Sequence, residues 1–448
     1  MISNKGSTVI GSNFAALVYA TTRSNYEYID YVYDARHRNH FAGTKLGDEW
    51  VDLGMILLEP TVATSQKAII SYSGEVRDEA TSFVHEFFTW LTTREIPVGR
   101  TVVKTFFRGE LVEDFFIADS LEILDTLTKS ERNSSNAELL EIIRCKNHER
   151  HPSRKRESMW FKTATYQQSS IGAMGWTITN LILEPWLTKV YGTDFESLLA
   201  IEHRGAWVPL FYPESLLEYL GSGNISFQQP IFAYPVNNSF ASVVRHMTRI
   251  IDSKCNIIDA HNFEIENLGK HSDVVYFGSP EFMVGRSAIS SDRIIVSEGK
   301  FRKKMSPGKV VYLECSESAP ITVFVVDIEK KAFRLSVRPS GSGKGTVAIV
   351  EYGHCAFDLS ENELIADARE TVESMVGVST LGESVATEIA FPSRTSGFLE
   401  VDQLYTRSKA MLTDLGWLGT PIGELNSSMN DQACAALHAT SVRERYSV

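Results

Sequence analysis

The first clear alternation of hydrophobic and polar residues lies between residues 7 and 34. A short β-branched run, Thr8-Val9-Ile10, ends at Gly11, and a stretch of mostly small and apolar residues, 14–20, follows with the composition of a helix packed on a sheet. A second, mostly apolar strand covers 29–33 and ends at Asp34. Strand, tight turn, helix and strand in this order predict a βαβ unit with parallel strands and a right-handed crossover.

The middle of the chain has mostly the periodicity of helices. Gly192 closes one of the helical segments, where a glycine is well suited to a left-handed C-cap. Two short apolar runs come later, and the second of them is typical of a buried parallel strand. The predicted helices cover 75–93, 117–127, 137–143, 176–191 and 239–251, and the predicted strands cover 256–258 and 273–277.

The pattern changes to short alternating runs after residue 309. These runs are separated by Pro, Gly and charged turns and indicate an antiparallel sheet in a second domain. A helix over 361–376 follows, with Ser360 as its N-cap. A glycine-rich turn at 416–423 precedes the last predicted helix, 430–442. The predicted strands of this region are 310–313, 321–326, 332–337 and 346–352.

Composition narrows the class of protein. The chain has 448 residues, of which 43% are hydrophobic and 22% charged, so a globular protein with a large core is expected. The net charge of -12 disfavours binding to nucleic acid or to an anionic membrane surface. The lack of a targeting segment and of a long apolar stretch predicts a cytoplasmic location. The five cysteines are widely spaced and odd in number, so neither a disulfide framework nor a zinc site is expected.

The turn that begins at Gly11 has the arrangement of a dinucleotide-binding site. In such a site the first position needs glycine for a tight turn, the second brings backbone close to a pyrophosphate, and the third needs a small residue for helix packing. Gly11 and Ala16 meet the first and third needs, and Asn13 stands at the second position. Asp34 follows about 20 residues on, where a carboxylate binds ribose hydroxyls. The alternative is a plain βαβ unit that binds no nucleotide.

Two other parts of the chain carry a resemblance to known proteins. Residues 42–44 read Ala-Gly-Thr and residues 50–54 read Trp-Val-Asp-Leu-Gly; near the C-terminus, 416–421 reads Gly-Trp-Leu-Gly-Thr-Pro and 429–431 reads Met-Asn-Asp. Together with the Gly11 turn, these motifs resemble the superfamily of FAD-dependent amine oxidases, protoporphyrinogen oxidases and UDP-galactopyranose mutase-like flavoproteins. Residues 180–192, 233–239, 273–280 and 333–336 resemble further segments of that group.

The resemblance implies an α/β fold in which a Rossmann-like FAD-binding domain is interleaved with a substrate domain of antiparallel sheet and helices. The FAD-binding domain would comprise 1–75, 231–300 and 396–448, and the substrate domain a mainly helical part, 76–230, and a β-sheet part, 301–395. The cofactor implied is FAD. Its expected contacts are Gly11, Asn13, Phe14, Ala15, Ala16, Asp34, Ala35, Gly43, Thr44, Gly54, Met55, Phe263, Gly419, Met429 and Asn430.

Arg334 is the candidate catalytic residue. It lies on an otherwise apolar strand, and its planar guanidinium could bind an anionic substrate or a flavin carbonyl. The alternative is an edge-strand charge that faces water. The basic cluster in 150–156 has the same two interpretations, with a solvated surface favoured. The stretch 341–346 departs from a phosphate-binding loop, and Cys145 with His148 and His151 lacks zinc spacing, so no metal is expected.

The sequence is compatible with three functions. The leading one is an FAD-dependent oxidoreductase that oxidises a small substrate by hydride transfer to flavin. The second is a UDP-galactopyranose mutase-like enzyme that acts on a nucleotide sugar with reduced FAD, favoured by the C-terminal motifs and disfavoured by Asn237 and Asn238 in place of glycines. The third is a non-catalytic relative that acts as a binding protein. The expected partner is a small-molecule substrate, with neither nucleic acid nor membrane, and a homodimer remains open.

Overall fold

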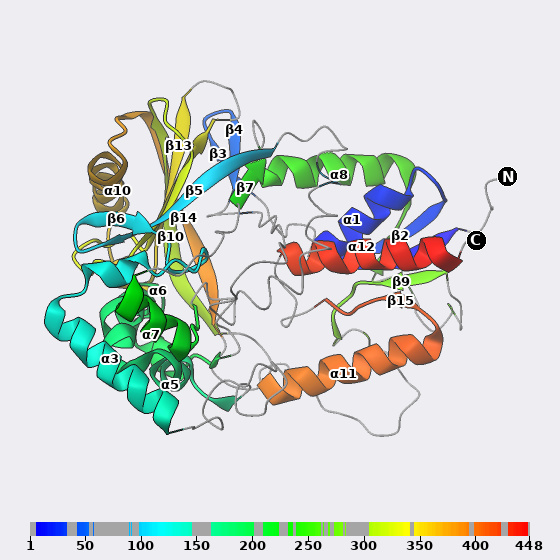
Figure 1. Cartoon of the computed structure of the whole chain (residues 1–448). Coiled ribbons are helices and arrows are strands. Elements are labelled where there is room, and N and C mark those ends of the chain that lie inside the picture. Colours follow the sequence, from blue (N-terminus) through cyan, green and yellow to red (C-terminus); the bar gives the residue numbers. More distant parts are fainter. Residues whose placement is uncertain are drawn as a thin grey trace.

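The computed structural model consists of two α/β lobes built from interleaved parts of the chain (Figure 1). One lobe holds a parallel sheet and the other a larger mixed sheet with a group of helices beside it. The structure describes residues 6–33, 43–52, 57, 89, 91, 98–145, 163–200, 209–223, 232–235, 239–260, 263, 268, 273–280, 283, 304–340, 345–393, 398–422 and 429–446.

The first lobe is a three-layer sandwich around a five-stranded sheet of order β15-β9-β1-β2-β8, in which all neighbours are parallel. Three helices pack on one face, where small and aromatic residues form the core, and α11 packs on the other face (Figure 1). The strands are β1 (Ser7–Ile10), β2 (Ile29–Tyr33), β8 (Asn256–Asp259), β9 (Val274–Tyr276) and β15 (Leu418–Gly419); the helices are α1 (Phe14–Arg23), α8 (Phe240–Lys254), α11 (Phe398–Leu415) and α12 (Met429–Tyr446).

The second lobe is built on an eight-stranded sheet of order β14-β10-β13-β12-β11-β5-β6, with β7 also paired to β5. Its neighbours are antiparallel except for β5 and β11, which run parallel. Helix α10 (Glu361–Val376) covers one face. The strands are β5 (Val98–Phe107), β6 (Glu110–Glu113), β7 (Phe232–Pro235), β10 (Lys304–Cys315), β11 (Ile321–Val325), β12 (Arg334–Pro339), β13 (Thr346–Tyr352) and β14 (Thr380–Ser393).

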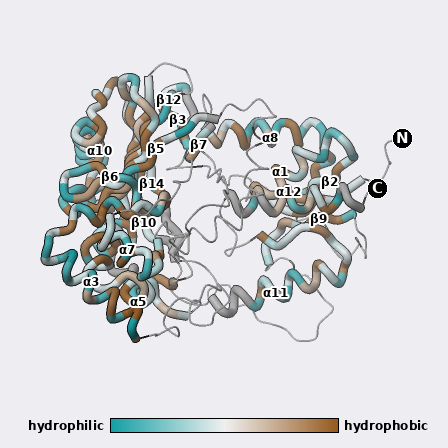
Figure 2. The backbone as a smooth tube through the Cα atoms, in the orientation of Figure 1, coloured by the Kyte–Doolittle hydropathy of each residue, from teal (hydrophilic) through white to brown (hydrophobic). Residues whose placement is uncertain are grey.

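Two units cover the other face of the mixed sheet. A two-stranded hairpin, β3 (Gly43–Leu46) and β4 (Glu49–Asp52), packs through Leu46 and Val51 against β10 and β13. A helical group packs against β5 and β11, with Trp186 of its own helix α6 in the shared core. The group comprises α3 (Lys129–Arg144), α5 (Tyr166–Ile178), α6 (Glu184–Tyr191) and α7 (Pro213–Ser222). Hydrophobic positions gather where strands and helices meet, whereas the outer helices α3 and α11 carry many hydrophilic residues (Figure 2).

Several predicted elements are confirmed and others are wrong. The helix over 361–376 and its N-cap Ser360 are present as predicted, and α8 begins after its N-cap Ser239. The predicted helix over 117–127 is wrong, because the buried Asp114 carboxylate accepts hydrogen bonds from the backbone amides of Ile117 and Ala118, both at 2.7 Å, and only a short 3-10 helix, Glu122–Thr126, forms. Strands β5, β6 and β14 and helix α11 were not predicted.

The predicted helix over 176–191 is one part of a longer broken helix. The chain is already helical at Tyr166, it kinks at Gly175, where φ is +83°, and a π-helical turn, Thr179–Leu183, joins α5 to α6. The Glu138 carboxylate accepts from the Thr177 backbone amide at 2.8 Å and so caps the second half. Gly192 ends α6 as predicted, but with φ +63° and ψ -137° it does not adopt the left-handed helical conformation expected of the C-cap. Most of the predicted helix 75–93 lies outside the described residues.

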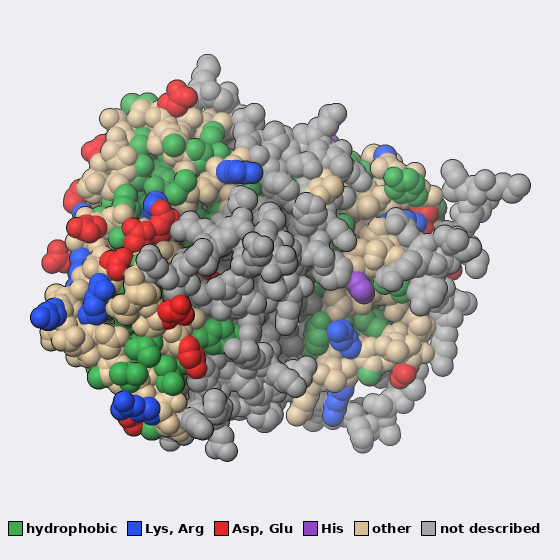
Figure 3. All heavy atoms as spheres, in the orientation of Figure 1, with side chains coloured by type: hydrophobic (Ala, Val, Ile, Leu, Met, Phe, Trp, Pro, Cys, Tyr) green, Lys and Arg blue, Asp and Glu red, His purple; other side chains and the backbone are tan. Residues whose placement is uncertain are grey.

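The predicted fold class, a Rossmann-like domain interleaved with a domain of antiparallel sheet and helices, is confirmed. The parallel sheet combines strands from the start, the middle and the end of the chain. Among the described residues no helix is long and apolar enough to cross a membrane. On the face seen in Figure 3, the described acidic and basic side chains are interspersed.

Candidate functional site

The carboxyl ends of β1 and β9 lie side by side at the switch point of the parallel sheet, where the order in which the chain adds strands reverses. From β1 the chain passes through α1 to β2 on one side, whereas β9, which lies much later in the sequence, pairs with β1 on its other side. In open α/β sheets, ligands bind in the crevice outside the carboxyl ends of the strands at such a switch point. Gly11 and Phe277 directly follow these two strands.

Gly11 brings the backbones of the two strand ends into close contact. Its φ is +151°, and a Cβ at this position would lie 3.0 Å from both the carbonyl carbon and the oxygen of Phe277. The Gly11 amide donates to Val32 O at 3.0 Å, and the Phe277 amide donates to Ile10 O at 2.7 Å. The turn therefore requires glycine at the position where the sequence predicted it.

Asn13 joins the start of α1 to the end of β9. Its Oδ1 accepts from the Ala16 amide at 3.1 Å, so the side chain is the N-cap of the helix. Its Nδ2 donates to the carbonyl oxygen of Phe277. Phe14, Ala15 and Ala16 behind it are fully buried. The predicted residues 11–16 thus form one compact unit at the switch point.

Gln432 is part of this unit and was missed in the sequence. The Phe14 backbone amide donates to Gln432 Oε1 at 2.9 Å, and Gln432 is buried in the first turn of α12. Small residues of the two helices, among them Ala16, Ala433 and Ala436, share one core. The signal for it in the sequence is a glutamine in the first turn of a predicted helix that is rich in alanine. The predicted cofactor residues Met429 and Asn430 begin the same helix, so the two helix N-termini lie close together.

The β3–β4 hairpin connects the two lobes. A Cβ on Gly43 would come within 2.8 Å of the Ala241 Cβ, so Gly43 allows the hairpin to lie directly on α8. Asp52 pairs with Gly43 across the hairpin; its Oδ1 accepts from the Ala241 amide at 2.9 Å, and its backbone oxygen accepts from the Tyr312 hydroxyl at 2.8 Å. Burial raises the pKa of the Asp52 carboxyl, and the Arg338 guanidinium opposes this rise. The predicted residue Thr44 lies in β3, where it pairs with Val51.

The hairpin face of the mixed sheet carries a buried row of charges. Arg334 Nη2 donates to Glu351 Oε1 at 2.7 Å, and its Nε donates to Oε2, so the pair is bidentate. Arg338 Nη1 lies 3.5 Å from Asp52 Oδ2. Burial lowers the pKa of Arg338, and Asp52 opposes this change. Because β12 lies between β11 and β13, the interpretation of Arg334 as an edge-strand charge facing water is wrong.

Gly419 and Phe263 are two further predicted cofactor residues on the parallel lobe. Gly419, with φ +93°, ends β15 and packs against the backbone of Tyr276 in β9. Phe263 packs on the α11 side of the sheet, with Ile10 and Trp417, opposite the face covered by α1 and α12. Asp34, Ala35, Gly54 and Met55 lie outside the described residues, as does the basic cluster in 150–156. In the described part of the chain, no group of three acidic, His or Cys side chains could hold a metal ion.

These features define an α/β protein with a close glycine turn at the switch point of a parallel sheet in one lobe and a mixed sheet in the other. Among solved structures, the chain is similar to reduced UDP-galactopyranose mutase, with a TM-score of 0.62 and 10% identity over 99% of this chain and 96% of that one. It is also similar to the PF1083 protein of Pyrococcus furiosus, with a TM-score of 0.50 and 12% identity over 98% and 97% of the two chains.

The likeness to the mutase is one of fold, and it extends over almost the whole chain. The fold that the sequence motifs implied is therefore confirmed. No family profile and no curated protein sequence matches the chain.

Proposed function

We propose that this chain is a flavin-dependent enzyme that binds FAD at the switch point and oxidises a small substrate by hydride transfer to the flavin. The observation that carries the proposal is the close turn of Gly11 against Phe277, with the N-terminus of α1 directly behind it. This geometry, in a chain that shares the fold of UDP-galactopyranose mutase, supports a dinucleotide cofactor.

The residues at the switch point fit such a cofactor. The first-turn amides and the positive end of the α1 dipole would attract the pyrophosphate, and the small side chains of Ala15 and Ala16 let α1 pack closely on its neighbours. Asp34 would bind the ribose. The N-terminus of α12, at Met429 and Asn430, would stabilise negative charge on the ring system. Ala35, Gly43, Thr44, Gly54, Met55, Phe263 and Gly419 remain predicted contacts.

Arg334 remains the candidate for contact with a substrate. The bidentate pair with Glu351 uses its Nε and Nη2 atoms and holds the guanidinium plane in one orientation. Its Nη1 could then donate to a carbonyl or an anionic group without any movement of the side chain. When bound, the flavin would supply the hydride acceptor, and these protein groups would orient the substrate and stabilise charge.

A mutase that acts on a nucleotide sugar is the second candidate function. The observation in its favour is the TM-score of 0.62 with reduced UDP-galactopyranose mutase over 99% of this chain. The two candidates share the cofactor and differ in whether the substrate is oxidised. The third function, a non-catalytic binding protein, would keep this fold without flavin chemistry.

The first experiment is reconstitution of the purified full-length protein with FAD, followed by its absorption spectrum and an equilibrium titration. Flavin bands near about 375 and 450 nm that remain after gel filtration are expected. Asn13→Asp is the matched variant, because Asp caps a helix as well as Asn but places a negative charge beside the pyrophosphate. It should weaken FAD binding at least about tenfold, and it should also lower the melting temperature, because a carboxylate cannot donate the hydrogen bond that Asn13 Nδ2 donates to Phe277 O.

Failure of the wild-type protein to bind FAD would contradict both enzyme functions and leave the binding protein. If FAD binds, turnover separates the two enzymes. Bleaching of the flavin by an added substrate, with hydrogen peroxide formed in air, supports the oxidase. Conversion of a nucleotide sugar only after reduction with dithionite supports the mutase.

A further inference from the structure

Two carboxamides of the chain already bind the amides at the start of α1. Gln432 Oε1 accepts from the Phe14 amide at 2.9 Å, and Asn13 Oδ1 accepts from the Ala16 amide at 3.1 Å. The two side chains come from opposite ends of the sequence. Both amides lie in the first helical turn, where the α1 N–H groups would otherwise point toward a ligand.

A backbone amide has one N–H donor, so a phosphate oxygen and a carboxamide oxygen compete for it. A charged acceptor forms the stronger hydrogen bond, and the positive end of the helix dipole adds to this preference. A pyrophosphate would therefore replace the neutral carboxamides, but its affinity is reduced by the hydrogen bonds that it must displace. Helix α1 also packs on α12 through the apolar residues Ala16, Ala433 and Ala436.

We propose that Gln432 and Asn13 compete with the cofactor pyrophosphate for the N-terminus of α1 and that these two carboxamides set the affinity for the cofactor. This inference rests on the proposed FAD site. Gln432 has the larger role, because it lies on a different helix from the amide that it binds. Cofactor binding consequently releases a contact between the first and the last helix of the chain.

Gln432→Met and Gln432→Glu test the proposal in opposite directions. Met keeps the length of the side chain but lacks the acceptor, so FAD should bind about three- to tenfold more tightly, the effect of one ordinary hydrogen bond. Glu keeps the acceptor and adds a negative charge beside the phosphate, so FAD should bind at least about tenfold more weakly. The affinities are measured by flavin fluorescence titration of the full-length protein after removal of bound flavin.

Gln168→Met is the matched control. Gln168 Oε1 accepts from the Thr165 amide at 3.2 Å in the capping box at the start of α5, which belongs to the helical group of the other lobe. Its substitution also removes a carboxamide that binds a helix-start amide, so it should lower the melting temperature without changing the FAD dissociation constant. Hydrogen exchange in the segment from Gly11 to Ala20, without flavin, should become faster in Gln432→Met and stay unchanged in Gln168→Met.

Tighter FAD binding by Gln432→Met, together with faster exchange at the start of α1, supports the proposal. Unchanged or weaker binding by Gln432→Met, while the wild type binds FAD, would overturn it, because Gln432 would then have no effect on the cofactor or would contact it directly. If the wild type and both Gln432 variants all fail to bind FAD, the proposed function itself is wrong and the inference falls with it. Asn13→Gly provides the same comparison if Gln432→Met does not fold.

Discussion

The backbone amide of Phe14 donates to the side-chain oxygen of Gln432 at 2.9 Å, although the two residues are 418 positions apart in the sequence. The first helix of the chain is thereby joined to the last one at their N-termini. A truncation or an insertion at the C-terminal end would consequently change the environment of the Gly11 turn. The long separation also explains why this contact is invisible to any local pattern in the sequence.

Gly11→Ala should lower the free energy of unfolding more than Gly377→Ala does. Both glycines have a positive φ, +151° and +70°, but a Cβ on Gly11 would press on the Phe277 backbone, whereas nothing lies within 4 Å of a Cβ on Gly377. We expect a loss of about 1–2 kcal/mol at Gly377 from backbone strain alone and at least about 3 kcal/mol at Gly11. Urea denaturation of the two variants measures the difference. Equal losses would mean that the contact with Phe277 is unimportant.

Arg334→Met should be strongly destabilising because it leaves the Glu351 carboxylate buried without its partner. The two side chains are 6% and 1% exposed. Removal of one member of such a pair costs about 3–5 kcal/mol, whereas replacement of both by apolar residues is often neutral. The double variant Arg334→Met/Glu351→Leu should therefore be more stable than Arg334→Met. Lys104→Met is the control, since its pair with Glu113 is 25% and 32% exposed and is worth less than about 1 kcal/mol. Similar losses in Arg334→Met and Lys104→Met would contradict the expectation.

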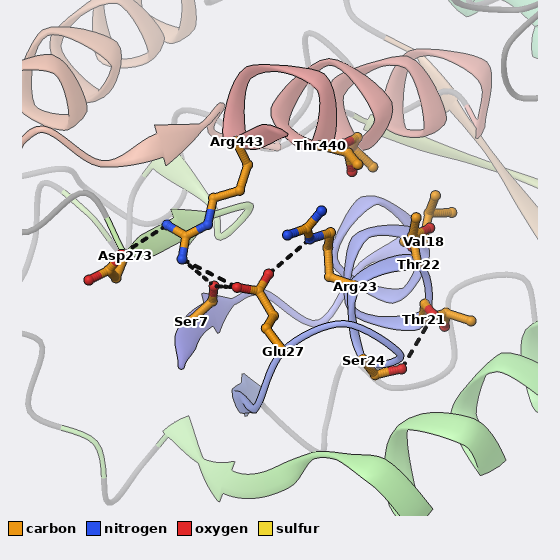
Figure 4. Close-up of polar contacts among 11 residues, drawn as sticks. Ser7, Val18, Thr21, Thr22, Arg23, Ser24, Glu27, Asp273, Thr440 and Arg443 are labelled. Atoms are coloured by element: carbon orange, nitrogen blue, oxygen red, sulfur yellow. Dashed lines mark hydrogen bonds and ion pairs between the residues drawn. The ribbon is translucent and has the colours of Figure 1, made fainter. Parts of the chain in front are cut away.

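Arg443→Met should loosen α12 from the amino-terminal edge of the parallel sheet. The Arg443 guanidinium donates to Asp273 Oδ1 at 3.0 Å and to Ser7 Oγ at 2.9 Å, and it lies 3.3 Å from Glu27 (Figure 4). Loss of these buried contacts should cost about 2 kcal/mol and speed hydrogen exchange in 429–446.

Arg23→Met is the control for Arg443. Arg23 binds the same Glu27 carboxylate at 2.9 Å, but from the end of α1, so its removal leaves the α12 contacts in place (Figure 4). Faster exchange of α12 in Arg23→Met, or unchanged exchange in Arg443→Met, would show that Arg443 does not hold the helix.

The Glu131 carboxyl should titrate near pH 2 in the folded protein. Its pKa is lowered to about 2 by the hydrogen bonds from Arg108, which donates to Oε1 at 2.6 Å and to Oε2 at 2.9 Å. Because the folded-state pKa lies below the unfolded value, the stabilisation from this pair is complete above about pH 4.5 and is lost as the pH falls toward 2.

NMR titration of the carboxyl carbons in wild type and Arg108→Gln measures this effect. The midpoint for Glu131 should rise in the variant. Glu363 is the internal control, because its pKa is lowered by Ser360 in a similar capping box that contains no arginine. A Glu131 midpoint that stays the same after removal of the guanidinium would refute the assignment.

Local patterns in the sequence were sufficient for the elements that depend on neighbouring residues. The βαβ unit around Gly11, the capped helix over 361–376 and the C-cap at Gly192 follow from turn, capping and periodicity rules that act within a few residues. The prediction over 117–127 failed, because the Asp114 side chain binds the backbone amides that a helix would use. Strand β5 was missed; it pairs with the adjacent β6, but also with β7 and with β11, which lies more than 200 residues later.

The sequence by itself determined the parallel-sheet unit, the glycine turn and the resemblance that led to an FAD-type fold, because each depends on short stretches of chain. Only the tertiary structure decided what the polar groups of the site contact. The pairs Phe14–Gln432, Asp52–Ala241 and Arg334–Glu351 join segments from different elements. Hydrogen bonds and ion pairs act over a few ångströms in space whatever the distance along the chain. Their partners are therefore fixed by packing of the elements, which no local pattern contains.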